Sequence, residues 1–145
     1  MLATARADEQ TMSKSTNPSP PEELPPEYLG FFACFNRAEF FEAHEVLEEL
    51  WLDCRMSAIG NFYKGLIQYA GVFVHLQHGR PAPAAALLRL AHGHLSTYPS
   101  PHERLEVEQV CADIRTWLGR VEGGEPIEAL LAPDQLPRLG LLPTA

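Results

Sequence analysis

Apolar residues recur at every third or fourth position along most of the chain after Pro25. This spacing places them on one face of an α-helix. Prolines and glycines interrupt the spacing and set the limits of each segment. The pattern predicts five helices, which cover roughly residues 26–36, 38–53, 59–77, 82–97 and 102–121.

The third of these segments, residues 59–77, is apolar on most sides, as is typical of a helix at the centre of a bundle. The connections between successive segments are short, and short connections place neighbouring helices antiparallel. No alternating apolar and polar run of useful length predicts a strand. The sequence therefore predicts an all-α fold, a compact antiparallel bundle of about five helices.

The two ends of the chain differ from this helical region. Residues 1–24 are polar and rich in Ser, Thr and Pro, so we expect a disordered N-terminal extension. Residues 25–122 form the predicted bundle domain. Residues 123–145 contain prolines and several leucines, and we expect a tail with one short helix near residues 127–131 and then an extended, Pro-rich strap on the bundle.

A weak internal repeat relates residues 35–50 to residues 76–91. Each stretch has a small residue at a predicted elbow, Ala38 or Gly79, then an alanine five positions on and a leucine four further. Two helical hairpins of the tetratricopeptide type would give this pattern. The simpler explanation, that any two crossing helices need small residues where they meet, is the one we favour.

Charge and cysteine content exclude several classes of function. The formal net charge is −8, and the 11 Lys and Arg residues are scattered. Such an acidic protein repels nucleic acid and anionic membrane, so neither is an expected partner. The 3 cysteines are too far apart to predict a zinc ribbon or a disulfide framework. With no signal-peptide core and no membrane span predicted, we expect a cytoplasmic protein.

The chemistry of the chain is concentrated in the predicted helix 38–53. At about 100° per residue, His44 falls in the middle of the apolar face of this helix. Glu48 lies one turn further along, at the edge of that face, and Glu45 lies slightly further round. A buried histidine without hydrogen-bond partners is costly, so His44 needs polar partners from a neighbouring helix.

The predicted helix 59–77 offers such partners. Lys64, Gln68, Gly71 and His75 fall on a single stripe of this otherwise apolar helix. If the two helices pack antiparallel, this stripe can meet the face that carries His44. We therefore predict a polar inter-helix site, with Tyr63 and Tyr69 at its margins, built from His44, Glu45, Glu48, Lys64, Gln68 and His75.

Three interpretations of this site remain open. In the first, the cluster is a structural hydrogen-bond network that fixes how the two helices dock. In the second, His44, Glu48 and His75 bind a divalent metal, although the second histidine of the HExxH zinc motif is missing. In the third, Glu45 or Glu48 acts as a general base with His44 as its partner, but no nucleophile or phosphate loop accompanies them.

The string FNRAEFFEAHEVLEELW at residues 35–51, followed by YKGLIQYAGVFVHLQHGRPAPAAALL at residues 63–88, resembles the family called domain of unknown function 309. Its EAHEVLE motif stands intact at residues 42–48, and its GLIQ block at residues 65–68. The resemblance covers roughly residues 28–98. It implies a compact all-helical fold and no known activity. The matching positions are Glu42, Ala43, His44, Glu45, Leu47, Glu48, Trp51, Lys64, Gly65, Gln68 and His75.

The sequence thus favours an uncharacterised helical-bundle protein whose polar site binds a divalent metal or a small polar ligand. The alternative is a non-catalytic interaction or scaffold protein, in which the His and Glu cluster is structural and a groove between hairpins takes a helix or peptide. The expected partners are a small polar ligand or another protein, including a second copy of the chain. The residues predict neither a reaction nor a catalytic residue.

Overall fold

The computed structural model of the chain describes residues 23–143, and over that range it contains helices and no strand. The predicted all-α bundle is confirmed. The disordered extension predicted for residues 1–24 lies almost entirely outside the described residues. The elements are Pro26–Asn36 (α1), Phe40–Cys54 (α2), Gly60–Gln77 (α3), Pro81–Leu95 (α4), Val107–Glu122 (α5), Ile127–Leu130 (α6) and a short 3-10 helix, Pro133–Gln135 (η1).

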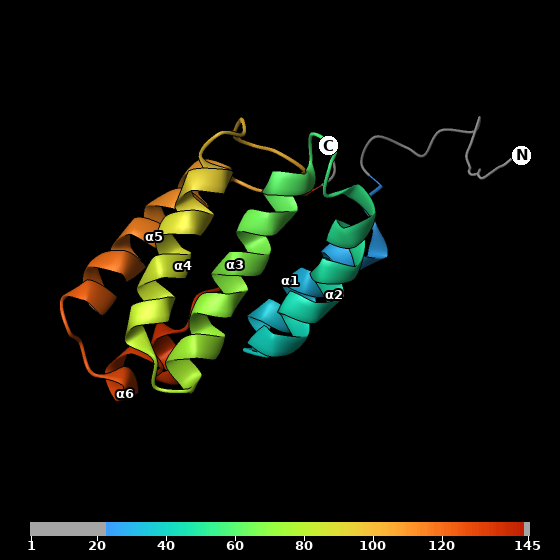
Figure 1. Cartoon of the computed structure of the whole chain (residues 1–145). Coiled ribbons are helices and arrows are strands. Elements are labelled where there is room, and N and C mark those ends of the chain that lie inside the picture. The colour runs from blue at the N-terminus through green and yellow to red at the C-terminus, as the bar shows by residue number, and fades with distance from the viewer. Residues whose placement is uncertain (1–22, 144–145) are drawn as a thin grey trace, which may run out of the picture.

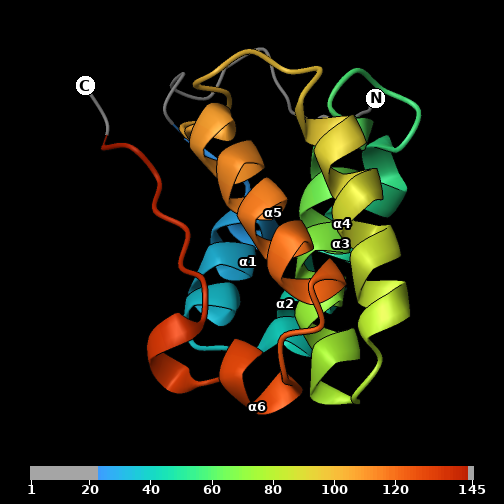
Figure 2. The ribbon, with the colours of Figure 1, turned by 90° about the vertical axis from the view of Figure 1, so that its left-hand side faces the viewer.

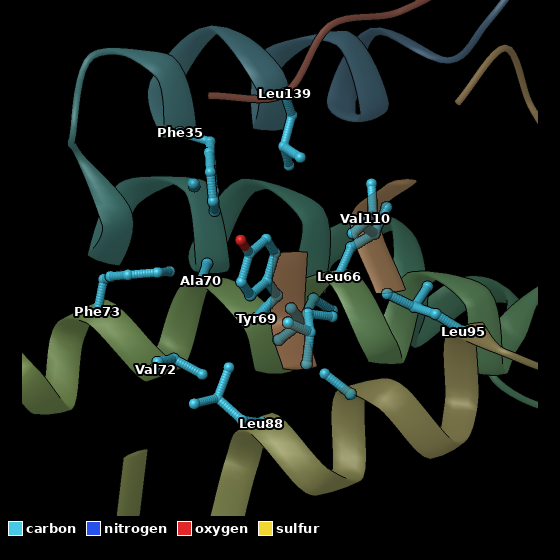
Figure 3. Packing of buried hydrophobic residues seen from close by; sticks show 14 of the residues in the cluster. Phe35, Leu66, Tyr69, Ala70, Val72, Phe73, Leu88, Leu95, Val110 and Leu139 are labelled. Carbon is cyan, nitrogen blue, oxygen red and sulfur yellow. The ribbon is translucent and has the colours of Figure 1, made fainter. Parts of the chain in front are cut away.

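Helix α3 lies at the centre of the bundle, as its apolar character predicts. Figure 1 shows it between α4 on one side and the pair of α1 and α2 on the other. Phe35 of α1 contacts Tyr69 of α3 with ring centroids 5.3 Å apart, and Trp117 of α5 contacts Phe73 of α3 at 4.9 Å. Figure 3 shows Tyr69 of α3 among the apolar side chains that these helices bury together.

Helices α2 and α3 run antiparallel. The start of α2 meets the end of α3, where the rings of Phe40 and Phe73 lie 4.9 Å apart. The end of α2 meets the start of α3, where Nζ of Lys64 lies 4.2 Å from the centre of the Trp51 ring. This register decides which residues of the two helices lie opposite each other.

Helices α3 and α4 approach closely because α3 has glycines where they cross. A Cβ atom at Gly65 would lie 2.7 Å from Cγ of Leu95, a side chain that is fully buried. A Cβ atom at Gly71 would lie 2.9 Å from Cδ1 of Leu87. Both distances are shorter than van der Waals contact. A larger residue at Gly65 would therefore press on the buried Leu95 of α4, whereas one at Gly71 would displace the end of the Leu87 side chain.

The elbows after α1 and after α3 have the same backbone geometry. Ala38 and Gly79 both have positive φ, 62° and 71°, which is the left-handed conformation that often ends a helix. At each elbow this residue and the next one donate their amides to carbonyls of the preceding helix, over 2.9–3.0 Å. The predicted start of the second helix at residue 38 is therefore wrong, and α2 begins at Phe40.

The fifth helix was predicted to begin at residue 102, but α5 begins at Val107. Glu103 and Arg104 have positive φ values of 49° and 61°, which are incompatible with an α-helix. Leu105 is only 1% exposed in this loop, and it pairs with Leu141 in an isolated β-bridge. The apolar residue that extends the helical pattern thus serves to hold the C-terminal tail.

The C-terminal tail runs back along α1 as an extended strap, which can be followed in Figure 2. Nδ2 of Asn36 donates to the carbonyl of Leu139 at 2.8 Å, and the amide of Leu139 donates to Oδ1 of Asn36 at 2.7 Å. Nε of Arg104 donates to the carbonyl of Leu142 at 2.7 Å. The predicted strap is confirmed, and it joins the end of the chain to α1.

Candidate functional site

A pocket of about 330 Å³ lies between α2, α3 and α4. Most of its wall comes from one stripe of α2 and one stripe of α3, because residues three or four positions apart share a helix face. Helix α4 closes it with a single leucine. The lining residues are Phe41, His44, Glu48, Trp51, Lys64, Ile67, Gln68, Gly71, Val74, His75 and Leu87.

Most of the residues predicted for the polar site line this pocket, namely His44, Glu48, Lys64, Gln68 and His75. The exception is Glu45, which is exposed to solvent outside the pocket. It follows His44 by one residue, and one residue turns the side chain about 100° round the helix. Tyr63 and Tyr69, predicted at the margins, lie in the core instead, 4% and 0% exposed.

Two residues near the pocket have roles that sequence reasoning missed. Trp51 was given no role in the predicted polar site, but it is partly buried and lines the pocket beside Lys64. His94 was given no role, yet its ring contacts a pocket residue. The sequence does place His94 on the side of α4 that meets the pocket. It shares one helix face with Leu87 and Ala91, since the three positions are spaced by four and three residues.

Gln68 and His94 connect α3 to α4 beside the pocket. Gln68 is a buried polar side chain, 8% exposed, and Nδ1 of His94 lies 2.8 Å from its Oε1. A carboxamide oxygen only accepts hydrogen bonds, so His94 carries its proton on Nδ1 and donates it. This bond orients the amide of Gln68 and leaves the two N–H groups of its Nε2 for the pocket.

His44 and His75 each have one ring nitrogen that is buried without a partner. Within residues 23–143, Nδ1 of each ring has no hydrogen-bond partner. A neutral imidazole has one donor and one acceptor nitrogen, and a buried donor without a partner is rarer than a buried acceptor without one. We therefore assign the proton to Nε2 in both rings, so each offers an Nε2–H donor.

Burial lowers the pKa of His75 from its ordinary value of 6.5, and the neighbouring Arg80 and His78 lower this pKa further. The ring geometry favours the same direction, since a second proton would sit on the buried Nδ1. His75 is thus a neutral hydrogen-bond donor at neutral pH.

The pocket contains one cation and one carboxylate. The ammonium of Lys64 lies over the Trp51 ring, 4.2 Å from its centre, a contact that stabilises a cation. Glu48 precedes Trp51 by three residues on α2, about 4.5 Å along the helix axis. Neither Lys64 nor Glu48 forms an ion pair with another residue of the described range. Two opposite charges therefore line one pocket without neutralising each other.

The predicted metal ligands do not come together. In the part of the chain from 23 to 143, no three His, Cys, Asp or Glu side chains are grouped so that they could hold a metal ion. His75 lies near the end of α3, where Phe73 meets Phe40, and Glu48 is about 12 Å further along α2. Side chains that share an ion each lie about 2 Å from it. Within the described residues, the structure therefore gives no support to the predicted metal site at His44, Glu48 and His75.

Residues 28–87 match the family model described as Domain of unknown function (DUF309). We call residues 28–87 the DUF309 stretch. The match covers α1, α2, α3 and the first part of α4. Every residue that lines the pocket falls inside the DUF309 stretch, from Phe41 to Leu87.

An uncharacterized protein of Aquifex aeolicus (strain VF5) is 29% identical to the chain over 94 residues. That alignment covers 65% of this chain and 28% of the relative, so the chain spans little more than a quarter of the relative's length. No solved structure matches the chain significantly. None of the helices between residues 23 and 143 has the length and apolar character needed to cross a membrane.

Proposed function

We propose that the protein binds a small polar ligand in the pocket between α2, α3 and α4. The observation that carries the proposal is a set of donors that no hydrogen bond within residues 23–143 uses: the ammonium of Lys64, the amide nitrogen of Gln68, and Nε2–H of His44 and His75. A ligand that carries acceptors would pair them.

The size of the pocket supports the same function. Its volume of about 330 Å³ falls in the range of small-molecule sites, which are mostly apolar with a few oriented polar groups. Phe41, Trp51, Ile67, Val74 and Leu87 supply the apolar part. We also keep the predicted cytoplasmic location as part of this proposal.

A purely structural network explains these contacts less well. A network that docks two helices satisfies its own members. Here Gln68 is bonded to His94 of α4, but in the described part of the chain no hydrogen bond joins His44 or Glu48 of α2 to α3. Apart from the contact of Lys64 with the Trp51 ring, the polar groups of α2 and α3 therefore line the pocket without holding its walls together.

A ligand-observed NMR screen of a fragment library against the full chain tests this function. Val74→Trp places an indole in the pocket, and Asn61→Trp adds the same ring at an exposed position of α3. We expect fragments that bind the wild type and Asn61→Trp but lose binding to Val74→Trp, with both variants still helical by circular dichroism. Hits that bind all three proteins equally, or the absence of hits, contradict the proposal.

A second candidate is the docking of a helix or peptide along the same groove. It is favoured by Phe41, a large apolar side chain that is 52% exposed at the pocket. The lining residues of α2 extend from Phe41 to Trp51, about 15 Å along the helix axis. Selection from a displayed peptide library, repeated with Phe41→Asp, tests this function. Peptides that lose binding to the variant support docking, and selection of none speaks against it.

A further inference from the structure

We propose that the ligand of this pocket is a small zwitterion with an apolar body, of the chemical class of a free apolar α-amino acid. This inference rests on the proposed function and names the ligand class for the same site. It is built on the arrangement of the two charges, on the donors beside them and on the apolar remainder of the lining.

The two charges of the pocket select against ligands of a single sign. Lys64 and Glu48 line the same pocket, and neither is neutralised by an ion pair within residues 23–143. A carboxylate that pairs with Lys64 lies near the carboxylate of Glu48, and an amine that pairs with Glu48 lies near the ammonium of Lys64. Either ligand leaves one charge uncompensated, which is costly in a partly buried site. A zwitterion pairs with both.

The donors of α3 indicate where the carboxylate of the ligand binds. Lys64 and Gln68 are four residues apart and so lie on one face of α3. The bond of 2.8 Å from His94 to Oε1 of Gln68 leaves the amide nitrogen of Gln68 as a donor beside Lys64. A carboxylate accepts several hydrogen bonds, and those from an ammonium are the strongest. We therefore assign the ligand's carboxylate to Lys64 and Gln68, and its ammonium to Glu48 on α2.

The rest of the lining indicates the apolar body. Burial of apolar surface contributes about 25 cal/mol for each Å² removed from water, so a hydrocarbon side chain on the ligand gains affinity here. Gly71 lets the Leu87 side chain pack closely against α3 as part of this lining, because a Cβ atom there would lie 2.9 Å from Cδ1 of Leu87. The apolar lining residues are Phe41, Trp51, Ile67, Val74 and Leu87.

Isothermal titration calorimetry with the full chain tests the ligand class. The probes are leucine and phenylalanine, each as the free amino acid, as its amide, which lacks the carboxylate, and as its N-acetyl derivative, which lacks the ammonium. We expect at least one free amino acid to bind tenfold or more tightly than both of its derivatives. An amide or N-acetyl derivative that binds as tightly as the free amino acid overturns the zwitterion.

Two isosteric variants and a neighbouring control assign the charges. Glu48→Gln should weaken binding of the free amino acid at least tenfold and remove the preference over the N-acetyl derivative. Lys64→Met should remove the preference over the amide. Glu49→Gln changes the next residue, which is exposed outside the pocket, and should leave affinity unchanged. Equal losses in Glu48→Gln and Glu49→Gln would point to a general charge effect and overturn the assignment.

The two proposals fail in different ways. If fragments bind in the pocket and are blocked by Val74→Trp, but none of the amino acids or derivatives binds, the zwitterion is overturned and the ligand-binding function stands. If no fragment and no amino acid binds, both are overturned.

Discussion

His94 of α4 donates a hydrogen bond of 2.8 Å to Gln68 of α3, one residue before Leu95 packs on Gly65. The bond therefore lies at a crossing where the two helices are as close as a glycine allows. The bond also fixes the orientation of the Gln68 side-chain amide, which lines the pocket on its α3 side. Although only Leu87 of α4 lines the pocket, the polar wall of α3 depends on this helix.

Removal of the imidazole at position 94 should destabilise the fold. His94→Ala leaves the buried carbonyl of Gln68 without its partner, and we expect a loss of about 1–3 kcal/mol in the free energy of unfolding. Urea denaturation measures this loss. His78→Ala is the control, since the His78 ring is exposed and bonds only to the Val74 carbonyl of its own helix. Equal changes in the two variants would mean that the inter-helix bond contributes nothing.

A matched pair of glycine substitutions tests the close crossing of α3 and α4. Gly65→Ala would place a methyl group 2.7 Å from Cγ of Leu95, and we expect it to destabilise the protein by about 1–3 kcal/mol through overpacking. Gly93→Ala places a methyl group where no atom lies within 4 Å, and should stabilise α4 by about 0.5–1 kcal/mol. Thermal unfolding compares the two. Stabilisation by both would show that α4 can move away without cost.

The two elbows respond to substitution in opposite directions. Gly79→Ala puts a side chain at a φ of 71° and should lower stability by about 1 kcal/mol. Ala38→Gly removes the strain at a φ of 62°, and after the extra entropy of glycine we expect a gain of about 0.5 kcal/mol. Chemical denaturation of both variants measures these changes. A loss in Ala38→Gly would indicate that packing of the Ala38 methyl outweighs its backbone strain.

The stability of the wild type should depend on His75 below neutral pH. Burial lowers the pKa of this ring in the folded state, so between that lowered pKa and the ordinary value of 6.5 the unfolded chain binds more protons. Stability therefore falls as the pH drops through about 6.5. His75→Gln removes this contribution, and its melting temperature should fall less between pH 7.5 and 5.5. If the melting temperatures of the two proteins fall in parallel between pH 7.5 and 5.5, His75 does not contribute to the pH dependence. Above pH 7.5 the difference between the two melting temperatures should stay constant.

Most of the fold could be predicted because helix periodicity is a local property. Apolar residues at helical spacing around Phe35, Leu47 and Leu88 predict the core-facing sides of three helices. All three side chains are fully buried. The wrong predictions are the starts of the second and fifth helices, because the pattern of apolar residues carries no information about the backbone angle φ. Ala38 and Leu105 both extend an apolar periodicity, but one ends a helix with a positive φ and the other packs against the tail.

Most of the polar residues of the candidate site could also be predicted from the sequence. The polar stripe of α2 and that of α3 have matching spacing, so they face each other once the two helices pack antiparallel. Glu45 was wrongly included because it lies near the edge of the stripe, where one residue decides between pocket and solvent. His94 was missed because its partner comes from another helix. The predicted metal ligands are not grouped in the described part of the chain, because helix faces give direction and not the axial distance between His75 and Glu48.

The clamp between Asn36 and Leu139 joins residues 103 positions apart in the chain. Most of the contacts among α1, α2, α3 and α4 are made between helices that follow each other directly, and such local contacts form quickly. Closing a long loop costs more entropy, so the clamp forms after them. During synthesis the N-terminal part of a protein folds first. The DUF309 stretch can thus pack helix by helix as it leaves the ribosome, and the hydrogen bonds between Asn36 and Leu139 then fasten the later segment, residues 136–142, to α1.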